Sequence, residues 1–451
     1  MIKSVNLRAI VLDILMEVNE NGAFSHHAIS DALKKYQYLE KKDRAFITRL
    51  ANGTIERQIT LDYVIDEYSQ VAVKRMKSVI RNVLRMAVYQ IMYMDGVPNS
   101  AACDEAVKLT NRRGFFNLSG FVNGVLRTVV RSYKDINYPD KERTPSRYLS
   151  IYYSVPEWIV KKWLAVYDFD RVESMLIAFL EKDDTTIRVN TCKTDVKTLK
   201  EKLESQGITV EDAPYVDEAL RISGFNYLDS MAEFRDGLFT IQDVSSMLVG
   251  KVAGVKSGDY VIDVCAAPGG KSLHVAELLK GTGYVEARDL SENKVELIRD
   301  NIERMGFVNI AARTKDALVF DELSEEKADI VLADLPCSGL GVIGNKSDLK
   351  YKMSATAITE LEELQRNILA VVNRYVKLGG VLIYSTCTIN PGENIDNVRW
   401  FAKTFNFELE SISEYLPEAL RSETTDEGYI QLLPSVHDCD GFFVARLKRV
   451  K

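Results

Sequence analysis

Residues that hold metals or form disulfides are scarce in this sequence. It contains four histidines and six cysteines among 451 residues, and no two cysteines are spaced as Cys-x-x-Cys. A structural zinc site is therefore not expected, and neither is any other metal site. A disulfide framework is not expected either, because a chain of this length can bury an ample core. No apolar run approaches the roughly 20 residues that a membrane helix needs, which predicts no membrane partner.

The beginning of the chain also lacks the features of a secretory signal. Asp13 and Glu17 interrupt its apolar stretch, and the apolar core of a signal would exclude such charges. We therefore expect a cytoplasmic protein. Hydrophobic residues make up 46% and charged residues 27% of the chain, which is typical of globular proteins, and the length indicates two or three domains.

Charge is distributed unevenly along the chain. The net charge is −7, yet residues 1–150 contain 23 Lys and Arg against 16 Asp and Glu, a surplus of seven positive charges. This asymmetry is compatible with a polyanion partner at the N-terminal part. It is equally compatible with an ordinary solvated surface, and charge alone does not separate the two interpretations.

Hydrophobic patterning predicts a multidomain protein with three regions. Apolar residues at helical spacing, such as those of 83–92 and 121–130, indicate an all-α domain over 1–140. A small α+β bridge is expected over 141–235, with strands at 185–191 and 220–223 and a helix at 196–206. Strand–helix alternation over 236–451 predicts a Rossmann-like α/β domain whose mostly parallel sheet is covered on both faces.

The expected elements of the third region can be placed from its apolar runs. Helices are predicted at 272–279, 292–305, 357–375 and 394–403. Strands are predicted at 239–242, 260–264, 284–289, 310–314, 330–334 and 381–385, with a late strand at 441–447. Because parallel sheets bind ligands at the carboxyl ends of their strands, the residues that follow these strands are the candidate site.

A turn rich in small residues follows the predicted strand 260–264. It consists of Cys265, Ala266, Ala267, Pro268, Gly269, Gly270 and Lys271. Small residues let the backbone approach a ligand closely, and glycines permit the tight turn. The turn matches neither the Gly-x-Gly-x-x-Gly dinucleotide pattern nor the phosphate loop of nucleotide hydrolases, which argues against a dehydrogenase or an NTPase.

Acidic residues end or follow the next strands. Asp289 lies 26 residues after Asp263, where a carboxylate can accept hydrogen bonds from both hydroxyls of a ribose. Asp316 follows the third strand, where it could meet an adenine edge. Each aspartate alone could be a helix cap or a loop residue, but their succession after three strands favours a nucleoside site.

Two cysteines follow the two further strands. Cys337 lies in Asp334-Leu335-Pro336-Cys337-Ser338-Gly339, and Cys387 lies in Tyr384-Ser385-Thr386-Cys387-Thr388. A soft nucleophile beside a nucleoside-type cofactor favours covalent attack on an electron-poor ring. The sequence spacing does not decide which of the two sulfur atoms attacks. Cys103, Cys192 and Cys439 are expected to be small buried hydrophobic residues.

These motifs, in this order, resemble the Sun/NOP2 family of RNA cytosine-C5 methyltransferases. The likeness runs from about residue 153 to the end and includes Arg188-Val189-Asn190-Thr191 and Gln242-Asp243-Val244-Ser245-Ser246. It implies S-adenosyl-L-methionine as the cofactor. The positions that would bind it are residues 265–271, Asp289 for the ribose, Asp316 near the adenine, and Asp334.

The resemblance also implies catalytic roles. Cys387 would attack the cytosine, Cys337 would resolve the adduct, Asp334 would hydrogen-bond the ring, and Lys271 would favour a thiolate. DNA cytosine methyltransferases use the cysteine of a Pro-Cys element instead, which would correspond to Cys337. The Sun/NOP2 likeness is the closer of the two and favours Cys387.

The helical region resembles NusB, a bacterial RNA-binding protein. The likeness lies in Asp43-Arg44-Ala45-Phe46, Val97-Pro98-Asn99-Ser100-Ala101 and 121–127. The pairing of the two domains implies 16S ribosomal RNA as the partner, with a single-stranded or flipped cytosine as the target. A monomer is expected. The alternatives are the same chemistry on another RNA, such as a transfer RNA, and a non-catalytic NusB-type assembly factor.

Overall fold

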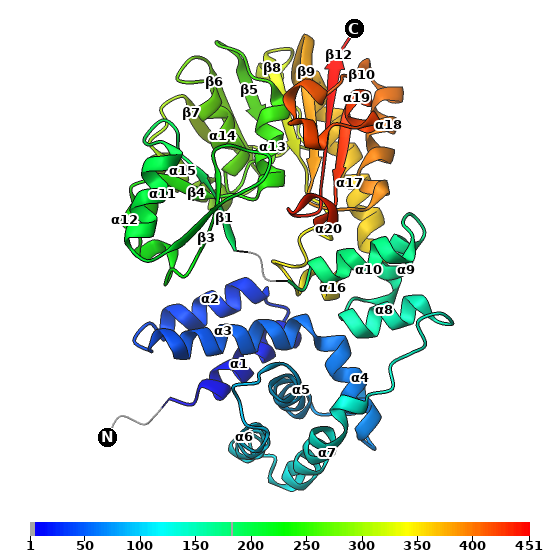
Figure 1. The fold of residues 1–451 in the computed structure, drawn as a ribbon. Coiled ribbons are helices and arrows are strands. Elements are labelled where there is room, and N and C mark those ends of the chain that lie inside the picture. The colour runs from blue at the N-terminus through cyan, green and yellow to red at the C-terminus, as the bar shows by residue number, and fades with distance from the viewer. Residues whose placement is uncertain (1–4, 182–183) are drawn as a thin grey trace. The chain divides into compact units, whose positions relative to one another are not determined.

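The computed structural model describes residues 5–181 and 184–451, which divide into two compact units (Figure 1). The first unit contains the chain up to Leu180 together with Ile343–Lys352. The second contains Glu181–Val342 and Met353–Lys451. In the described parts of the chain, no helix combines the length and the apolar character needed to cross a membrane.

Helices, without strands, make up the described residues of the first unit. They are α1 (Leu7–Asn19), α2 (Ser25–Lys35), α3 (Lys41–Glu56), α4 (Gln58–Tyr68), α5 (Ser78–Tyr93), α6 (Asn99–Arg112), α7 (Ser119–Ser132), α8 (Pro145–Tyr153), α9 (Glu157–Leu164), α10 (Phe169–Ala178) and α16 (Leu349–Lys352), with short 3-10 turns at Val73–Arg75, Phe116–Leu118 and Tyr133–Asp135. The predicted all-α N-terminal domain is confirmed, whereas its predicted end at residue 140 stays a prediction.

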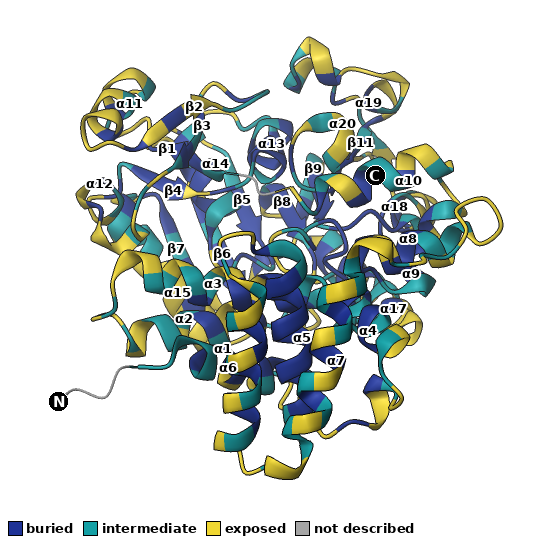
Figure 2. Cartoon of the chain, turned by 60° about the horizontal axis from the view of Figure 1, so that its bottom comes forward, coloured by how far each residue is buried: buried dark blue, intermediate teal, exposed yellow. Residues whose placement is uncertain are grey.

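Helix α5 forms the centre of the first unit. It packs against α1, α3, α4, α6 and α7 and is buried along most of its length (Figure 2). A helix that is surrounded on all sides must satisfy any charge that it carries. Arg85 does so by donating two hydrogen bonds to the Asp62 carboxylate, at 2.6 and 2.7 Å. Gly53 of α3 lets the Tyr89 ring pack close, since any Cβ there would overlap the ring.

A segment that follows Cys337 in the sequence, Ile343–Lys352, is anchored in the first unit. Asp348 is buried and accepts hydrogen bonds from the backbone N and the Oγ of Ser25, at 3.1 and 2.6 Å. Lys350 Nζ and the Tyr351 hydroxyl both donate to the carbonyl oxygen of Glu56, each at 2.9 Å. These buried polar contacts tie the segment to α2 and α3.

The second unit begins with a small antiparallel sheet of order β2-β3-β1-β4. Its elements are β1 (Thr185–Val189), α11 (Val196–Ser205), β2 (Thr209–Asp212), β3 (Ala219–Ser223), α12 (Ala232–Arg235) and β4 (Phe239–Ile241), with a 3-10 turn at Leu228–Ser230. The prediction that 239–242 opens the C-terminal sheet is wrong, because β4 pairs with β1. A short apolar run does not show which partner strand it will meet.

The larger sheet has eight strands, ordered β10-β12-β9-β8-β5-β6-β7, with β11 paired to β12. Its strands are β5 (Tyr260–Asp263), β6 (Tyr284–Asp289), β7 (Ile310–Thr314), β8 (Ala328–Asp334), β9 (Val376–Thr386), β10 (Phe407–Leu409), β11 (Tyr429–Leu432) and β12 (Phe442–Arg449). Strands β5 to β9 are parallel, whereas β10, β11 and β12 pair antiparallel. The sheet is therefore mixed.

Helices cover both faces of this sheet. They are α13 (Val244–Ala253), α14 (Gly270–Leu278), α15 (Glu292–Met305), α17 (Ala355–Val372), α18 (Ile395–Thr404), α19 (Glu423–Glu427) and α20 (Pro434–His437), with 3-10 turns at Glu322–Ser324, Asn373–Tyr375, Pro391–Glu393, Ser413–Tyr415 and Glu418–Leu420. Successive strand residues point to opposite faces. Leu332 and Ile383 join the core of α13–α15, and Val331 and Leu382 join that of α17 and α18.

Candidate active site

The turn between β5 and α14 lies at the carboxyl edge of the parallel strands. Gly269 has a φ of +107°, in the region that favours glycine. The backbone N of Ala266 donates to the Arg288 carbonyl oxygen at 2.8 Å, and the backbone N of Gly269 donates to the Ala266 carbonyl oxygen at 2.7 Å. The predicted cofactor turn, 265–271, is thus fixed against the end of β6.

Asp263 supports this turn from within the core. Its carboxylate is buried and accepts a hydrogen bond from Ser272 Oγ at 2.5 Å. Burial, with a further contribution from the negative charge of Asp334, raises the pKa of Asp263 to about 7. Burial also raises the pKa of the Cys265 thiol strongly, so this cysteine contributes its backbone rather than a thiolate.

Asp289 connects the predicted ribose position to the turn. Its Oδ2 accepts from the backbone N of Ala267 at 3.0 Å, and its Oδ1 accepts from the backbone N of Leu290 at 2.8 Å. Lys294 Nζ lies 3.1 Å from Oδ1. The structure thus brings Asp289 and residues 265–271 together at one edge of the sheet, and such a carboxylate beside a small-residue turn fits a nucleoside.

Asp316 lies two residues beyond the end of β7, at the same edge. Its side chain is half-buried, and its Oδ1 accepts from the backbone N of Leu318 at 2.9 Å within its own loop. Strands β6 and β7 are parallel neighbours, with Asp289 paired to Thr314. Asp316 therefore follows the strand beside that of Asp289, as the predicted nucleoside site requires.

Lys271 and Asp334 form an ion pair beside this edge. Lys271 Nζ lies 2.8 Å from Asp334 Oδ2, and Ser385 Oγ donates to Asp334 Oδ1 at 2.8 Å. Burial alone would lower the pKa of Lys271, but the Asp334 carboxylate outweighs it and raises the pKa. The ammonium group also lies 5.3 Å from the centre of the Phe442 ring. Lys271 is therefore a charged group held inside the site.

The two predicted cysteines are brought into contact by strands β8 and β9. Asp334 pairs with Ser385 in this parallel ladder, and the loops that follow carry Cys337 and Cys387. The two Sγ atoms lie 3.3 Å apart, neither cysteine is in a disulfide, and both are half-buried. The hydrogen bond to Cys387, then burial, then the charge of Cys387 and that of Glu393 raise the pKa of Cys337 well above its ordinary value.

Glu393 was missed by the sequence reasoning. It is fully buried and accepts hydrogen bonds from the backbone N of Ser338 at 2.7 Å and from Ser338 Oγ at 2.6 Å. The signal that could have found it is the polar run Asn390-Pro391-Gly392-Glu393-Asn394 shortly after Cys387. Ser385 and Phe442, which contact Asp334 and Lys271, were missed as well.

The remaining cysteines lie outside this cluster. Cys103 and Cys439 are buried, as expected for small hydrophobic residues. Cys192 is exposed, so the prediction that it is buried is wrong. It follows β1 in a polar turn, where its backbone N donates to Asn190 Oδ1 at 3.2 Å.

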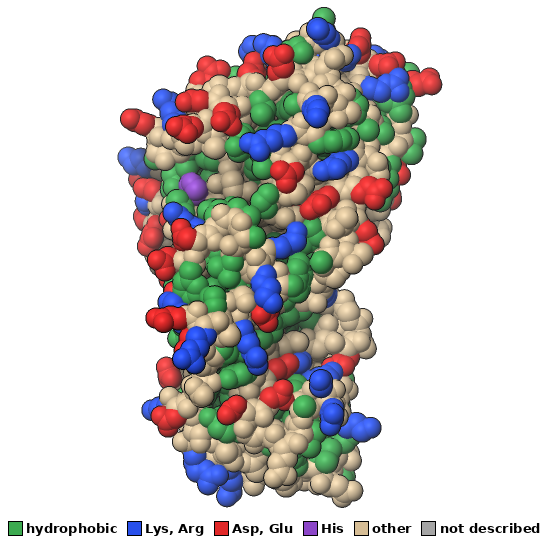
Figure 3. Space-filling model, turned by 90° about the vertical axis from the view of Figure 1, so that its right-hand side faces the viewer, with side chains coloured by type: hydrophobic (Ala, Val, Ile, Leu, Met, Phe, Trp, Pro, Cys, Tyr) green, Lys and Arg blue, Asp and Glu red, His purple; other side chains and the backbone are tan. Residues whose placement is uncertain are grey.

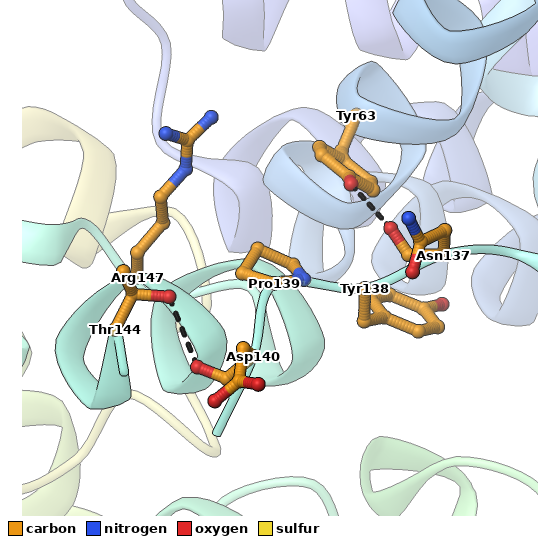
Figure 4. Close-up of a pocket in the computed structure, with 7 residues that line it drawn as sticks. All are labelled: Tyr63, Asn137, Tyr138, Pro139, Asp140, Thr144 and Arg147. Atoms are coloured by element: carbon orange, nitrogen blue, oxygen red, sulfur yellow. Dashed lines mark hydrogen bonds between the residues drawn. The ribbon is translucent and has the colours of Figure 1, made fainter. Parts of the chain in front are cut away.

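A separate cavity of about 430 Å³ lies in the first unit (Figure 4). The Tyr63 hydroxyl donates to the Asn137 carbonyl oxygen at 2.6 Å, and the Tyr63 and Tyr138 rings are stacked with centroids 6.1 Å apart. It is lined by Tyr63, Asn137, Tyr138, Pro139, Asp140, Thr144 and Arg147. None of the predicted site residues lines this cavity.

Comparisons with known proteins first define the class. Residues 252–448 match the model of the family described as 16S rRNA methyltransferase RsmB/F. Residues 5–131 match the NusB family, and residues 155–227 match a ferredoxin-like domain of RsmF/B-like methyltransferases. The fold is thus that of an S-adenosylmethionine-dependent methyltransferase with an N-terminal NusB-like domain.

Solved structures support this assignment. The crystal structure of PH0851 is 28% identical in sequence, with a TM-score of 0.82, and the match covers 98% of this chain and 99% of that one. A methyltransferase homologue from Pyrococcus horikoshii is also 28% identical, with a TM-score of 0.57, over 67% of this chain and 97% of that one. The predicted multidomain fold class is confirmed.

Similarity over the whole length identifies the family. A probable ribosomal RNA small subunit methyltransferase B of Bacillus subtilis (strain 168) is 36% identical over 455 residues, covering 99% of each chain. A protein with the same description from Synechocystis sp. (strain PCC 6803) is 30% identical over 448 residues, covering 99% of this chain and all of that one. The chain belongs to the 16S rRNA methyltransferase RsmB/F family, and its cofactor is S-adenosylmethionine.

Proposed function

We propose that this protein transfers a methyl group from S-adenosylmethionine to C5 of a cytosine in 16S ribosomal RNA, through a covalent bond between Cys387 and C6 of the ring. The supporting observation is the contact of the two Sγ atoms, 3.3 Å apart, at the sheet edge that holds the Lys271–Asp334 ion pair. The target that the likeness implies is cytosine 967.

The reaction needs a nucleophile because cytosine C5 is itself a poor one. The Cys387 thiolate forms a bond to C6, and the electron pair of the C5–C6 double bond becomes available at C5. When bound, S-adenosylmethionine supplies an electrophilic methyl group. Removal of the C5 proton by a base then restores the double bond and breaks the bond between C6 and the Cys387 sulfur, which regenerates the thiolate.

The charges around the two sulfur atoms favour Cys387 as the nucleophile. The Lys271 ammonium interacts with Cys387, and a neighbouring positive charge stabilises a thiolate. Cys337 instead faces the negative charge of Glu393, which favours its neutral thiol. We therefore assign Cys387 to attack and Cys337 to the release of the adduct.

Asp334 is assigned to the cytosine ring. Ser385 and Lys271 each hold one of its carboxylate oxygens at 2.8 Å, so its position is fixed before a substrate arrives. A carboxylate so placed can accept a hydrogen bond from the exocyclic amine or from a protonated N3.

The RNA must present its cytosine outside a helix, in a loop or flipped out of the stack. Six basic residues of the first unit are candidates for phosphate contacts: Lys74, Arg75, Lys77, Arg81, Arg112 and Arg113. Arg81 is paired with Glu20, and Arg113 with Asp13. The other four, Lys74, Arg75, Lys77 and Arg112, are exposed. On the face drawn in Figure 3, basic and acidic side chains are interspersed. We propose that the four exposed residues contribute to RNA binding by a cytoplasmic monomer.

A pair of substitutions tests the assignment of the two cysteines. With unmodified 16S RNA and labelled S-adenosylmethionine, Cys387→Ala should abolish methyl transfer and leave cofactor binding largely intact. Cys337→Ala should slow release and accumulate a covalent protein–RNA species, visible as a shifted band on a denaturing gel. The reverse pattern would exchange the two roles. Transfer by the wild type to a transfer RNA but not to 16S RNA would overturn the substrate.

A further inference from the structure

Glu393 is a buried acid that the proposed reaction does not itself use. It ends the 3-10 turn Pro391–Glu393, and none of its surface is exposed to solvent. An ionised carboxylate in such a place is unfavourable unless donors surround it. The hydrogen-bond donors around the Glu393 carboxylate therefore indicate which segments it holds in place.

Five donors converge on the Glu393 carboxylate, from both sides of the cysteine pair, and the weakest is Thr388 Oγ1 at 3.5 Å from Oε2. The Ser338 backbone N and Gln365 Nε2 donate to Oε1, at 2.7 and 3.3 Å. Ser338 Oγ and Asn390 Nδ2 donate to Oε2, at 2.6 and 3.1 Å. Ser338 directly follows Cys337, and Asn390 follows Cys387 by three residues. The carboxylate thus joins the two loops.

A second hydrogen bond links the residues that come directly after each cysteine. Ser338 Oγ and Thr388 Oγ1 lie 2.8 Å apart. Because the Ser338 hydroxyl donates to Glu393, it accepts from the Thr388 hydroxyl. The chain of contacts therefore runs from Thr388 through Ser338 to Glu393, and each link depends on the carboxylate being an acceptor.

The same carboxylate distinguishes the two sulfur atoms electrically. Its negative charge acts on Cys337, whereas the Lys271 ammonium acts on Cys387. A neutral amide of the same shape would keep some hydrogen bonds but would remove this asymmetry. It would also turn an NH2 group towards donors, either the Ser338 backbone N and Gln365 Nε2 or Ser338 Oγ and Asn390 Nδ2.

We propose that Glu393 is a positioning residue that joins the loops of Cys337 and Cys387. It thereby holds the two sulfur atoms in contact, with Cys337 on the side of the Glu393 carboxylate and Cys387 on the side of the Lys271 ammonium. The consequence for catalysis rests on the proposed function. The consequence for the distance between the thiols does not, because it concerns the folded protein without RNA.

The experiment therefore measures the thiols first. Diamide takes one hydrogen from each thiol, forms the Cys337–Cys387 disulfide and is itself reduced to the hydrazine. Mass spectrometry of the full chain follows the rate of this reaction. Sulfur atoms already in contact should close rapidly in the wild type. In Glu393→Gln, closure should be about tenfold slower, because charged hydrogen bonds no longer hold the loops.

Glu362→Gln is the matched control. Glu362 Oε1 also accepts from Asn390 Nδ2, at 3.1 Å, but this glutamate makes no hydrogen bond to Ser338. Its substitution should change the rate of closure by less than about twofold. Equal slowing in both glutamine variants, or no slowing in Glu393→Gln, would overturn the proposal. So would a wild type that forms no disulfide between these cysteines.

Methyl transfer is measured second, with the same proteins. Glu393→Gln should lower kcat about tenfold and change the KM for S-adenosylmethionine by less than about twofold, because the cofactor turn is not among its contacts. If Glu393→Gln does not fold, Ser338→Ala removes one donor to the carboxylate and should slow closure about threefold. A wild type without methyl transfer, but with rapid closure, would refute the proposed function and leave the positioning role standing.

Discussion

Two lysines, the half-buried Lys271 and the buried Lys350, have surroundings that move their pKa values in opposite directions. Lys271 lies 2.8 Å from the Asp334 carboxylate, and its pKa is raised. Lys350 donates to the carbonyl oxygen of Glu56, and burial lowers its pKa to about 7. A full opposite charge compensates for the loss of water, whereas a carbonyl dipole does not.

This difference in pKa suggests different roles: the charge of Lys271 serves the proposed reaction, whereas a charge on Lys350 lowers the stability of the fold. At the sheet edge, the ammonium of Lys271 fixes Asp334 and interacts with Cys387. The carboxylate offsets the desolvation cost of this charge, and the charge serves the proposed reaction. In the helical unit, Lys350 supports the path of Ile343–Lys352 through its length and its hydrogen bond. The same substitution at both positions should therefore have different consequences.

The largest effect is expected for Lys271→Met. It leaves Asp334 without its cation and Cys387 without a positive neighbour, so kcat for methyl transfer should fall about 100- to 1000-fold. Single-turnover transfer to unmodified 16S RNA measures this. Lys350→Met makes the same chemical change in the other region and serves as the control. A comparable loss in both variants would mean that burial, rather than the ion pair, matters.

Lys350→Met should have the next largest effect, on stability. An unfolded lysine keeps its proton up to about pH 10.4, but the folded Lys350 loses it near pH 7. The wild-type free energy of unfolding should therefore gain from this group as pH rises from about 7 to about 10, and lose that gain as pH falls. The methionine variant should lack this slope and be more stable at pH 7 by roughly 3 kcal/mol.

Denaturant unfolding of both proteins at several pH values tests this, since the difference between them isolates Lys350 from other titrating groups. Parallel curves for wild type and variant would contradict the prediction. A less stable variant at pH 7 would show that the hydrogen bond to Glu56 outweighs the buried charge.

Ser385→Ala should have a smaller effect and sharpens the role of Asp334. It removes the donor to Oδ1 but leaves the ion pair with Lys271, so kcat should fall about tenfold. Steady-state kinetics with saturating S-adenosylmethionine measure the loss. An effect as large as that of Lys271→Met would mean that the hydroxyl, and not the lysine, holds the carboxylate.

Tyr351→Phe should have the smallest effect and probes the other region. The hydroxyl donates to Glu56 O at 2.9 Å and lies 3.0 Å from Ser154 Oγ, so its loss should lower the free energy of unfolding by about 1 kcal/mol. Methyl transfer should change less than with Ser385→Ala. A stability loss above that caused by any single hydrogen bond would indicate that the segment detaches as a whole.

Local patterns were sufficient for much of the fold and of the candidate site. The strands that end in Asp263 and Asp334 have buried apolar runs, and the parallel arrangement brings their ends, together with the end of the strand at Asp289, to one edge. The contact between Cys337 and Cys387 follows from the same rule, since β8 and β9 are neighbours. The exact spacing of the sulfur atoms did not follow from it.

What escaped the sequence depends on partners far along the chain. Glu393 contacts Ser338, 55 residues earlier, and the polar run around Glu393 marks it as a candidate without indicating that partner. β4 was assigned to the wrong sheet because a strand of three residues does not indicate which strand it pairs with. β10 and β11, of three and four residues, are too short for a periodic signal.

The route of Ile343–Lys352 has a practical consequence for anyone who would study the catalytic half alone. A fragment that starts after Leu180 would still contain these ten residues but would lose α2 and α3, which shield Asp348 and Lys350 from water. The segment Ile343–Lys352, with its apolar and charged side chains, would then be exposed to solvent shortly after Cys337. A fragment of the second unit should therefore either carry a redesigned Ile343–Lys352 segment or retain α2 and α3, which cover it.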